Sequence, residues 1–235
     1  MAIEAKRRLA IFDLDNTLLA GDSDYLWGQF LVEQGIVDGP AYERENRRFY
    51  EQYKAGTLDI QEFQRFSLQP LVQNPLEQMH ELRRRFVQTR IEPIIARHAL
   101  ELLRRHRTRG DETLIITATN RFVTEPIASL LGVPQLLATD AEMRDGRYTG
   151  EIAGTPCFQR GKVLRLEEWL AAKGQRFSEH WFYSDSHNDV PLLEVADVPV
   201  AVNPDPQLNE LARARAWPIL DLRSERFPEN WLSEP

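Results

Sequence analysis

Four acidic side chains in two short clusters could hold a cation and take part in phosphate chemistry. Asp13 and Asp15 stand two residues apart, and Asp185 and Asp189 form the second cluster far along the chain. Carboxylates at i and i+2 of an extended segment point to the same side, and further acids beside them would repel unless a cation lay between them. Oxygen ligands of this kind suit Mg²⁺, which keeps several waters and also binds substrate phosphate oxygens. The acids therefore predict a magnesium site.

Two further polar residues, Thr117 and Lys162, could bind the oxygens of a phosphate group. A hydroxyl and an ammonium group both donate hydrogen bonds to phosphate, and the backbone N–H groups at the start of a helix add to them. The alternative for Lys162 is an exposed lysine on a helix, in which case its replacement would have no effect on activity.

These residues follow short apolar runs that are typical of buried strands. The runs alternate with amphipathic helices, which predicts an α/β fold with a Rossmann-like parallel sheet. Ligands bind beyond the carboxyl ends of the strands in such a sheet, so Asp13, Thr117 and Asp185 should converge there. We expect strands at residues 9–12, 113–116, 135–138, 181–183 and 198–202.

Residues 20–95 interrupt this rhythm and predict a helical insert. They show helical periodicity with aromatic anchors and no convincing strand, and Gly56 and the interval 70–75 supply turns. We therefore expect an α/β core domain of residues 1–19 and 96–235, with residues 20–95 forming a helical-bundle cap domain.

Composition fits an ordinary globular protein and excludes several classes of partner. The 235 residues are 42% hydrophobic and 28% charged, enough for one sizeable core and a smaller module. The net charge of −7 leaves the chain without the cationic field that attracts nucleic acids or anionic lipids. The arginine-rich runs at 83–85 and 104–107 fit the ends of helices instead. We expect a small-molecule substrate as partner, no nucleic acid and no membrane, and the oligomeric state stays open.

The single cysteine and the short apolar runs bear on the compartment. Cys157 cannot form an internal disulfide, and no histidine-paired setting surrounds it, which favours a small buried hydrophobic residue over a catalytic thiol. No run approaches the roughly 20 apolar residues of a membrane span, and the stretch at residues 9–12 stops too soon for a signal peptide. These features predict a cytoplasmic protein.

Taken in order, the chemical residues resemble the four motifs of the haloacid dehalogenase superfamily of phosphotransferases. The framework that they mark runs from residue 9 to about residue 203. Four elements in this order, each at the end of an apolar run, are hard to obtain by chance. The matching segments are Asp13-Leu14-Asp15-Asn16-Thr17, Thr117, Lys162 and Ser184-Asp185-Ser186-His187-Asn188-Asp189.

The resemblance implies a role for each matching residue. Asp13 is the nucleophile that forms an aspartyl-phosphate, and Asp15 is the general acid and base. The ligands of Mg²⁺ are Asp13, Asp185 and the backbone carbonyl of Asp15. Asp189 lies next to these ligands without binding the metal itself. Lys162 completes the catalytic set and pairs with Asp13. The residues implied to contact the phosphate or the rest of the substrate are Thr117, Ala118, Asn188 and Asp22.

The helical insert resembles the cap of the phosphoserine phosphatase branch of this superfamily. Asp22 falls where that branch carries an acidic residue that contacts the substrate's amino group. The alternative is that Asp22 and Asp24 only cap the helix that begins near Tyr25. A hairpin within residues 138–154, with Asp145-Gly146 as its turn, also resembles this branch.

Two departures from that branch bear on the substrate. The second motif reads Thr117-Ala118-Thr119 in place of a Ser-Gly-Gly type of turn. The fourth motif begins with Ser184 and carries His187 before Asn188. Bacterial proteins of this branch with such features also resemble phosphatases for histidinol phosphate. We therefore expect a small phosphorylated metabolite similar to phosphoserine or histidinol phosphate.

The function expected from these features is hydrolysis of a phosphomonoester with Mg²⁺ as cofactor. One alternative is a phosphotransferase or phosphomutase that passes the aspartyl-phosphate to a hydroxyl group instead of water. An alternative of another class is a receiver protein whose Asp13 accepts a phosphoryl group without catalysis, although a receiver needs neither Asp15 nor the cap. Three arginines of the insert, Arg44, Arg47 and Arg48, could clamp a substrate carboxylate or form a solvated helix face.

Overall fold

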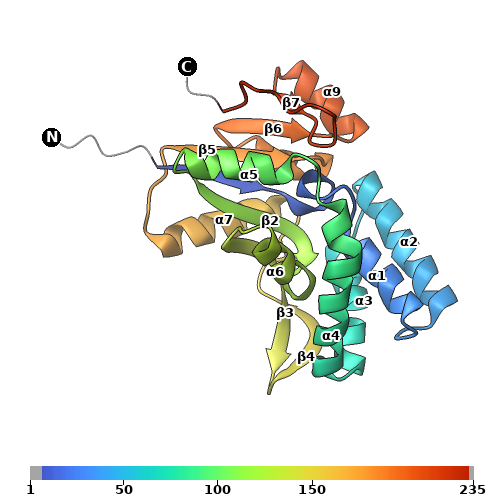
Figure 1. The fold of residues 1–235 in the computed structure, drawn as a ribbon. Coiled ribbons are helices and arrows are strands. Elements are labelled where there is room, and N and C mark those ends of the chain that lie inside the picture. The colour runs from blue at the N-terminus through green and yellow to red at the C-terminus, as the bar shows by residue number, and fades with distance from the viewer. Residues whose placement is uncertain (1–6, 233–235) are drawn as a thin grey trace.

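The computed structural model describes residues 7–232, whose strands form one twisted sheet with helices on both faces (Figure 1). Within these residues the sheet has seven strands in the order β4-β3-β2-β1-β5-β6-β7. Neighbouring strands are parallel except in the β3–β4 hairpin, so the predicted α/β fold is confirmed. The strands are β1 (Arg8–Phe12), β2 (Glu112–Asn120), β3 (Gln135–Arg144), β4 (Arg147–Ala153), β5 (Glu179–Ser184), β6 (Val198–Val202) and β7 (Ile219–Leu220).

Strand β1 lies at the centre of the sheet, and its side chains alternate between two hydrophobic cores. Ala10 and Phe12 belong to the core that includes α5 and α6, whereas Leu9 and Ile11 belong to the core that includes α7, α8 and α9. This arrangement explains why the strand is apolar on both faces. The helices of the two layers are α5 (Ala99–Thr108), α6 (Arg121–Leu130), α7 (Arg160–Lys173), α8 (Val190–Leu193) and α9 (Pro206–Ala214).

The chain between β1 and α5 forms a group of helices beside the sheet (Figure 1). It leaves and re-enters the core at one place, because Leu19 and Ile95 form an antiparallel bridge. This bridge coincides with the predicted boundaries, and the division into two domains stays a prediction. The helices are α1 (Ser23–Glu33), α2 (Gly39–Ala55), α3 (Ile60–Gln73) and α4 (Leu76–Phe86), followed by short turns at Val87–Ile91 and Glu92–Ile94.

Aromatic side chains join this helical segment to the core. The ring of Trp27 in α1 lies 5.2 Å from that of Phe86 in α4 and 6.1 Å from that of Phe122 in α6. The guanidinium of Arg83 lies 4.5 Å from the centre of the Phe122 ring and donates a hydrogen bond of 2.7 Å to the Phe122 carbonyl. Buried aromatic contacts of this kind hold the helical segment against the end of β2.

One boundary predicted from the sequence is wrong. The strand expected at residues 113–116 continues to Asn120, because pairing with β3 resumes there after a register shift that begins at Ile116. Thr117 therefore lies inside an irregular part of a strand. The turn predicted within residues 70–75 is present between α3 and α4, although Pro70 itself is buried inside α3, which ends only three residues later. A proline so near the end removes a single backbone hydrogen bond from the helix.

The predicted hairpin is present, and it extends β3 well beyond the expected residue 138. Asp145 and Gly146 both have positive φ angles, 49° and 75°, as a tight two-residue hairpin turn requires. Within residues 7–232, no helix combines the length and the apolar character needed to cross a membrane.

A buried polar network lies beneath the ends of β1 and β5. The ring of His106 in α5 is completely buried, with Nδ1 2.8 Å from Asp111 Oδ2 and Nε2 2.8 Å from the Tyr183 hydroxyl. Burial lowers the pKa of His106 despite the attraction of Asp111, so the ring is neutral: Nδ1–H donates to Asp111 and Nε2 accepts from Tyr183. The Tyr183 ring in turn stacks on Phe12 at 4.9 Å.

Replacing His106→Leu should lower the free energy of unfolding by about 1–3 kcal/mol, because the buried Asp111 carboxylate and Tyr183 hydroxyl each lose a partner. Urea unfolding with an unchanged m-value measures this effect. His80→Leu removes an exposed imidazole and should change stability by less than about 0.5 kcal/mol. Equal midpoints for the parent and His106→Leu would show that the network contributes nothing.

Candidate active site

The carboxyl ends of β1 and β5 bring Asp13 and Asp185 together. The register pairs Phe12 with Tyr183, and the Asp13 N–H donates to the Tyr183 carbonyl at 2.9 Å. The Thr17 hydroxyl lies 3.1 Å from Asp185 Oδ1 and 3.4 Å from Asp13 Oδ2, and it accepts the Asp185 N–H at 3.0 Å. Two carboxylates that are distant in sequence thus share one small polar site.

An irregular turn at Leu14–Leu18 places Thr17 between these acids. Asn16 in this turn has a φ of 58°, in the left-handed region that asparagine tolerates better than most residues. Its N–H donates to the Gly21 carbonyl at 2.9 Å. The reversal of the chain at Asn16 explains how Thr17 returns toward the strand end.

Lys162 is buried in the first turn of α7 and bridges two acids. Its Nζ lies 2.7 Å from Asp13 Oδ1 and 2.7 Å from Asp189 Oδ2, and only 2% of the residue is exposed. Burial alone would lower the pKa of Lys162, but the two carboxylates outweigh it and raise that pKa above its ordinary value. The alternative of an exposed helix lysine is therefore wrong.

Glycine at position 161 allows α7 to approach the loop before it. A Cβ at Gly161 would lie only 2.1 Å from the Pro156 carbonyl oxygen, which no side chain can do without moving the backbone. The Gly161-Lys162 pair thus combines close backbone packing with a buried charge.

Asp15 is held by two donors at the edge of the site. Its Oδ1 accepts the Ser23 N–H at 2.6 Å, and its Oδ2 accepts the Thr119 hydroxyl at 2.8 Å. Burial and the neighbouring Asp22 raise the pKa of Asp15 to about 7, against which the two hydrogen bonds act. Burial also raises the pKa of Asp13 to about 7, although Lys162 opposes this change. Both carboxyls can therefore change protonation state near neutral pH.

The residues predicted to contact phosphate lie in two different settings. Thr117 is 1% exposed and lines the pocket with Ala118, and its hydroxyl accepts the Thr119 N–H at 3.3 Å. Asn188 instead donates to the Tyr53 carbonyl at 3.0 Å and accepts from Gln159, so it joins the helical segment to the core. Contact between Asn188 and phosphate stays a prediction.

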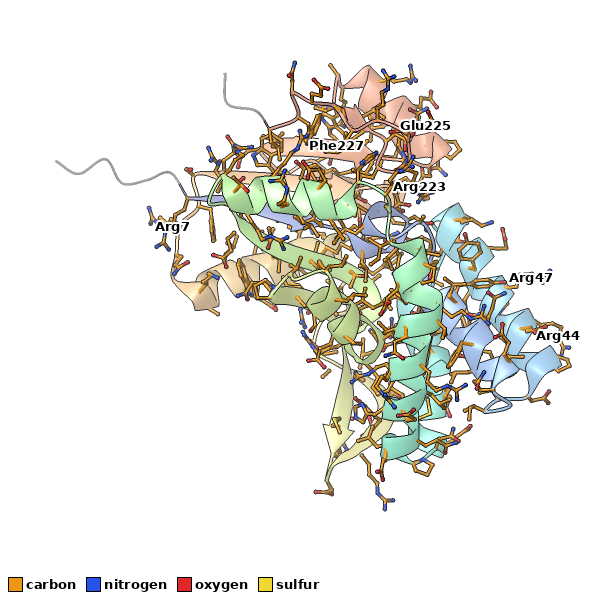
Figure 2. The ribbon with its side chains drawn as sticks, in the orientation of Figure 1. Arg7, Arg44, Arg47, Arg223, Glu225 and Phe227 are labelled. Carbon is orange, nitrogen blue, oxygen red and sulfur yellow. The ribbon has the colours of Figure 1, made fainter. Side chains whose placement is uncertain are left out.

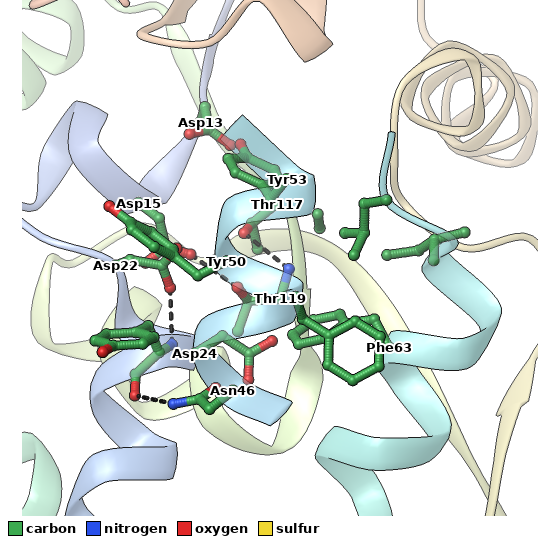
Figure 3. A pocket seen from close by; sticks show the side chains of 15 residues that line it. Asp13, Asp15, Asp22, Asp24, Asn46, Tyr50, Tyr53, Phe63, Thr117 and Thr119 are labelled. Carbon is green, nitrogen blue, oxygen red and sulfur yellow. Dashed lines mark hydrogen bonds between the residues drawn. The ribbon is translucent and has the colours of Figure 1, made fainter. Parts of the chain in front are cut away.

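A pocket opens between these strand ends and the helical segment (Figure 3). Asp22 lies in its wall and also caps α1 by accepting the Tyr25 N–H at 2.9 Å, so the two interpretations of Asp22 are compatible. Several lining residues carried no clear signal in the sequence, because aromatic residues of a helical bundle usually form its core. The lining residues are Asp13, Asp15, Asp22, Asp24, Tyr25, Asn46, Phe49, Tyr50, Tyr53, Leu58, Ile60, Phe63, Thr117, Ala118 and Thr119.

The acids suit a divalent cation. Burial, together with Asp13 and Asp189, raises the pKa of Asp185 well above its ordinary value, as expected when carboxylates crowd without a counter-charge. Within residues 7–232, no cluster of three or more His, Cys, Asp or Glu residues meets the geometry of a complete metal cage. A site with two carboxylates and otherwise water or backbone oxygens is what Mg²⁺ commonly uses. Asp13, Asp185 and the Asp15 carbonyl thus remain the proposed ligands.

Other candidate residues from the sequence lie outside the pocket. Arg44 and Arg47 project from the outer side of α2 (Figure 2), and Arg48 pairs with Glu45 and Glu62 there. Arg44 and Arg48 thus belong to a solvated helix face, whereas Arg47 lines a neighbouring cavity with Asp22 and Tyr25. His187 is held through Nδ1 by Asp205 at 2.7 Å, close to Asn188.

Cys157 is buried near the Leu137 carbonyl, and burial raises the pKa of its thiol to about 12. The residue is therefore a small core side chain, as predicted, and not a reactive thiolate.

Comparison with known proteins identifies the family. A model of haloacid dehalogenase-like hydrolases matches residues 10–194. The chain belongs to this hydrolase family. The match covers all four motif segments, so the resemblance predicted from them is confirmed, as is the prediction of an enzyme.

Individual relatives of this hydrolase agree with the family assignment. It is 43% identical over 221 residues to a histidinol-phosphatase of Neisseria meningitidis serogroup C (strain 8013), over 92% of this chain and 100% of the relative. The crystal structure of a Bordetella pertussis Tohama I protein of unknown function superposes with a TM-score of 0.88 at 45% identity, over 93% and 100% of the two chains. A substrate-bound phosphoserine phosphatase shares the fold, with a TM-score of 0.67 at 20% identity over 88% and 91%.

The crowding of acids around Asp185 has a measurable consequence. In metal-free buffer, Asp185→Asn should raise the free energy of unfolding by about 0.5–2 kcal/mol, because it removes one repelling charge while keeping an oxygen for Thr17. Added Mg²⁺ should then stabilise the parent hydrolase and leave the variant unchanged, because ligands stabilise only a folded state that binds them.

Thermal unfolding with and without Mg²⁺ measures both effects. Glu210→Gln, which removes an exposed carboxylate from α9, is the matched control and should respond to Mg²⁺ as the parent does. An equal Mg²⁺ response in Asp185→Asn and the parent would rule out Asp185 as a ligand.

Proposed function

We propose that this hydrolase is a Mg²⁺-dependent phosphomonoesterase that forms an aspartyl-phosphate on Asp13 and acts in the cytoplasm. Its family and its similarity to a histidinol-phosphatase support hydrolysis of a small phosphorylated metabolite similar to histidinol phosphate or phosphoserine. The observation that carries the proposal is the buried contact of 2.7 Å between Lys162 Nζ and Asp13 Oδ1 beside the pocket. This contact favours the ionised form of Asp13 and orients the carboxylate for attack on phosphorus.

In the first half-reaction, a carboxylate oxygen of Asp13 attacks phosphorus in line with the ester oxygen. The new O–P bond forms as the P–O bond to the alcohol breaks, and the neutral form of Asp15 gives its proton to the departing alkoxide. A pKa of about 7 for Asp15 keeps part of the enzyme in this protonated form at neutral pH. Lys162 and the Thr117 hydroxyl donate to the phosphoryl oxygens, whose negative charge they stabilise.

In the second half-reaction, Asp15 accepts a proton from water, and the water oxygen attacks the phosphorus of the aspartyl-phosphate. The bond between Asp13 and phosphorus breaks, which restores the carboxylate and releases inorganic phosphate. The hydrogen bonds from Ser23 and Thr119 keep the Asp15 carboxyl in one orientation for both proton transfers. Bound Mg²⁺ would neutralise charge between the Asp13 carboxylate and the phosphate dianion.

Asp13→Asn tests this function. The variant should lose phosphate release by on the order of 10³-fold or more, because the amide oxygen is a far weaker nucleophile. The assay measures inorganic phosphate from histidinol phosphate, phosphoserine, sugar phosphates and nucleotides in Mg²⁺. Acid-quenched parent enzyme should carry phosphate on the peptide that contains Asp13, detected by mass spectrometry.

Circular dichroism controls for the fold of the variant. Activity equal to that of the parent would exclude Asp13 as the nucleophile. Added acceptor alcohols separate the alternatives: phosphate transfer to the alcohol in excess of hydrolysis would indicate a phosphotransferase, and a phosphorylated protein without turnover would indicate a receiver.

A further inference from the structure

The C-terminal segment, residues 221–232, lies along α5 after strand β7. The Nη1 of Arg105 in α5 donates to the carbonyls of Pro228, Glu229 and Trp231 at 2.9, 3.0 and 2.8 Å. The guanidinium of Arg105 also lies 4.6 Å from the centre of the Phe227 ring. In Figure 2, Phe227 lies over α5, and Arg223 lies nearer to the helical segment. The C-terminal segment is thus packed on the core.

The first residues of this segment contact the chain where it returns from the helical segment to the core. The His98 N–H donates to the Leu222 carbonyl at 3.0 Å, and His98 Nε2 lies 3.0 Å from the Ser224 carbonyl. The Leu222 side chain is completely buried. His98 comes shortly after Ile95, which forms the bridge to Leu19.

Arg223 reaches the other linker, where the chain leaves β1. Its Nη2 donates to the Asn16 carbonyl at 2.6 Å and to the Leu19 carbonyl at 3.5 Å. Asn16 lies inside the turn at Leu14–Leu18, and Leu19 follows it. Arg223 and Asn16 also line one cavity together with Asp185. One segment therefore contacts both linkers between the core and the helices.

The backbone of Arg223 is fixed to the sheet by two polar side chains. Asp221 Oδ1 accepts the N–H groups of Arg223 and Ser224 at 2.8 and 3.1 Å. Asn203, which follows β6, donates through Nδ2 to the same Asp221 oxygen and accepts the Leu222 N–H at 3.1 Å through Oδ1. The guanidinium that contacts the turn after β1 thus extends from an anchored backbone.

The turn that Arg223 contacts carries two residues of the site, Asp15 and Thr17. Asn16 lies between them with a φ of 58°. A residue other than glycine keeps this left-handed conformation only when its surroundings hold it there. The hydrogen bond from Arg223 to the Asn16 carbonyl is one such support, and it acts directly between the two site residues.

This support differs from an ordinary contribution to stability. Arg223 is an exposed residue, so water could satisfy the Asn16 and Leu19 carbonyls in its absence, and its loss should change the free energy of unfolding little. Water could not hold the two carbonyls at a fixed distance from the sheet, as an anchored guanidinium does. Catalysis is sensitive to such positions, because a shift of about 1 Å in reacting groups lowers rates strongly.

We infer that Arg223 is a positioning residue for phosphoryl transfer, which holds the Leu14–Leu18 turn so that Asp15 and Thr17 keep their places beside Asp13. It acts through the backbone of this turn and not on the substrate. The inference rests on the proposed function, because it takes Asp13 and Asp15 as the reacting groups. It gives a role in activity to the C-terminal segment, which lies beyond the residues 10–194 that match the family.

Arg223→Met tests the inference, because it keeps the length of the side chain and removes its donors. With the full chain in Mg²⁺ and the ester that the parent hydrolyses fastest, kcat should fall about 10- to 100-fold, as expected for misplaced reacting groups. KM should change little, since the pocket walls that bind the ester stay in place. Arg223→Lys keeps a cation with donors and should recover part of the lost kcat. Arg226→Met removes an exposed arginine from the same segment and should keep the parent's kcat.

Amide hydrogen exchange measures the turn itself, without any turnover. The N–H groups of Asn16 and Leu19 donate to the carbonyls of Gly21 and Leu14, so their exchange reports opening of the turn. The peptide that contains residues 14–19 should exchange faster in Arg223→Met than in the parent and in Arg226→Met. Urea unfolding should give nearly the parent's midpoint for Arg223→Met, which separates a displaced turn from a loss of fold. If Arg223→Met does not fold, Arg223→Gln is measured in the same way.

Three results would overturn the inference: a parent-like kcat in Arg223→Met, an equal loss of kcat in Arg226→Met, or a fall in kcat without faster exchange at the turn. Each of them, with a parent that hydrolyses esters, would leave the proposed function intact. Absence of turnover by the parent on every ester would instead refute the proposed function. Exchange at residues 14–19 would still decide whether Arg223 holds the turn.

Discussion

One buried ammonium group determines how the acids of this site coexist. Lys162 contacts Asp13 and Asp189 at 2.7 Å each, deep under the strand ends, and Asp185 lies beside them through Thr17. Without that charge, three buried carboxylates would have to take up protons or separate, because isolated buried charge is very costly. The single lysine does not neutralise all of them, and we propose that the excess negative charge attracts a divalent cation, which would in turn help to bind a phosphate ester.

The helical segment completes this site from the other side. The turn after α2 rests on the core, where the Tyr53 carbonyl accepts from Asn188 and a Cβ on Gly56 would lie 2.9 Å from His187 Nε2. Asn188 and His187 thus help to position the helices. This contact between the turn and the core, together with the aromatic contacts to α6, encloses the pocket. A pocket that holds little water strengthens every electrostatic interaction within it. The same helical segment contributes acids and aromatic rings to the wall of the pocket.

The convergence of Asp13, Thr117 and Asp185 could be predicted because polar groups at the carboxyl ends of parallel strands meet at one edge of the sheet, whereas the roles of these residues stay predictions. The sequence also predicted the helical insert and the hairpin, whose periodicity and Asp145-Gly146 turn are local signals. It misplaced the end of β2, which depends on pairing with β3. The unpartnered oxygen of Asp24 was not predictable, since an acid near a helix start has a sufficient local explanation in capping, and that oxygen is visible only in three dimensions.

The central claim is that these acids and Lys162 surround one phosphoryl-transfer centre on Asp13. A crystal structure with Mg²⁺ and beryllium trifluoride, which imitates a phosphoryl group on a carboxylate, tests it most directly. We expect beryllium bonded to the Asp13 carboxylate, fluorides facing Lys162 and Thr117, and Mg²⁺ in contact with Asp13 and Asp185. Beryllium trifluoride bound to another residue would contradict this account, and so would an Asp13 carboxylate that stays unmodified at a saturating concentration of beryllium trifluoride.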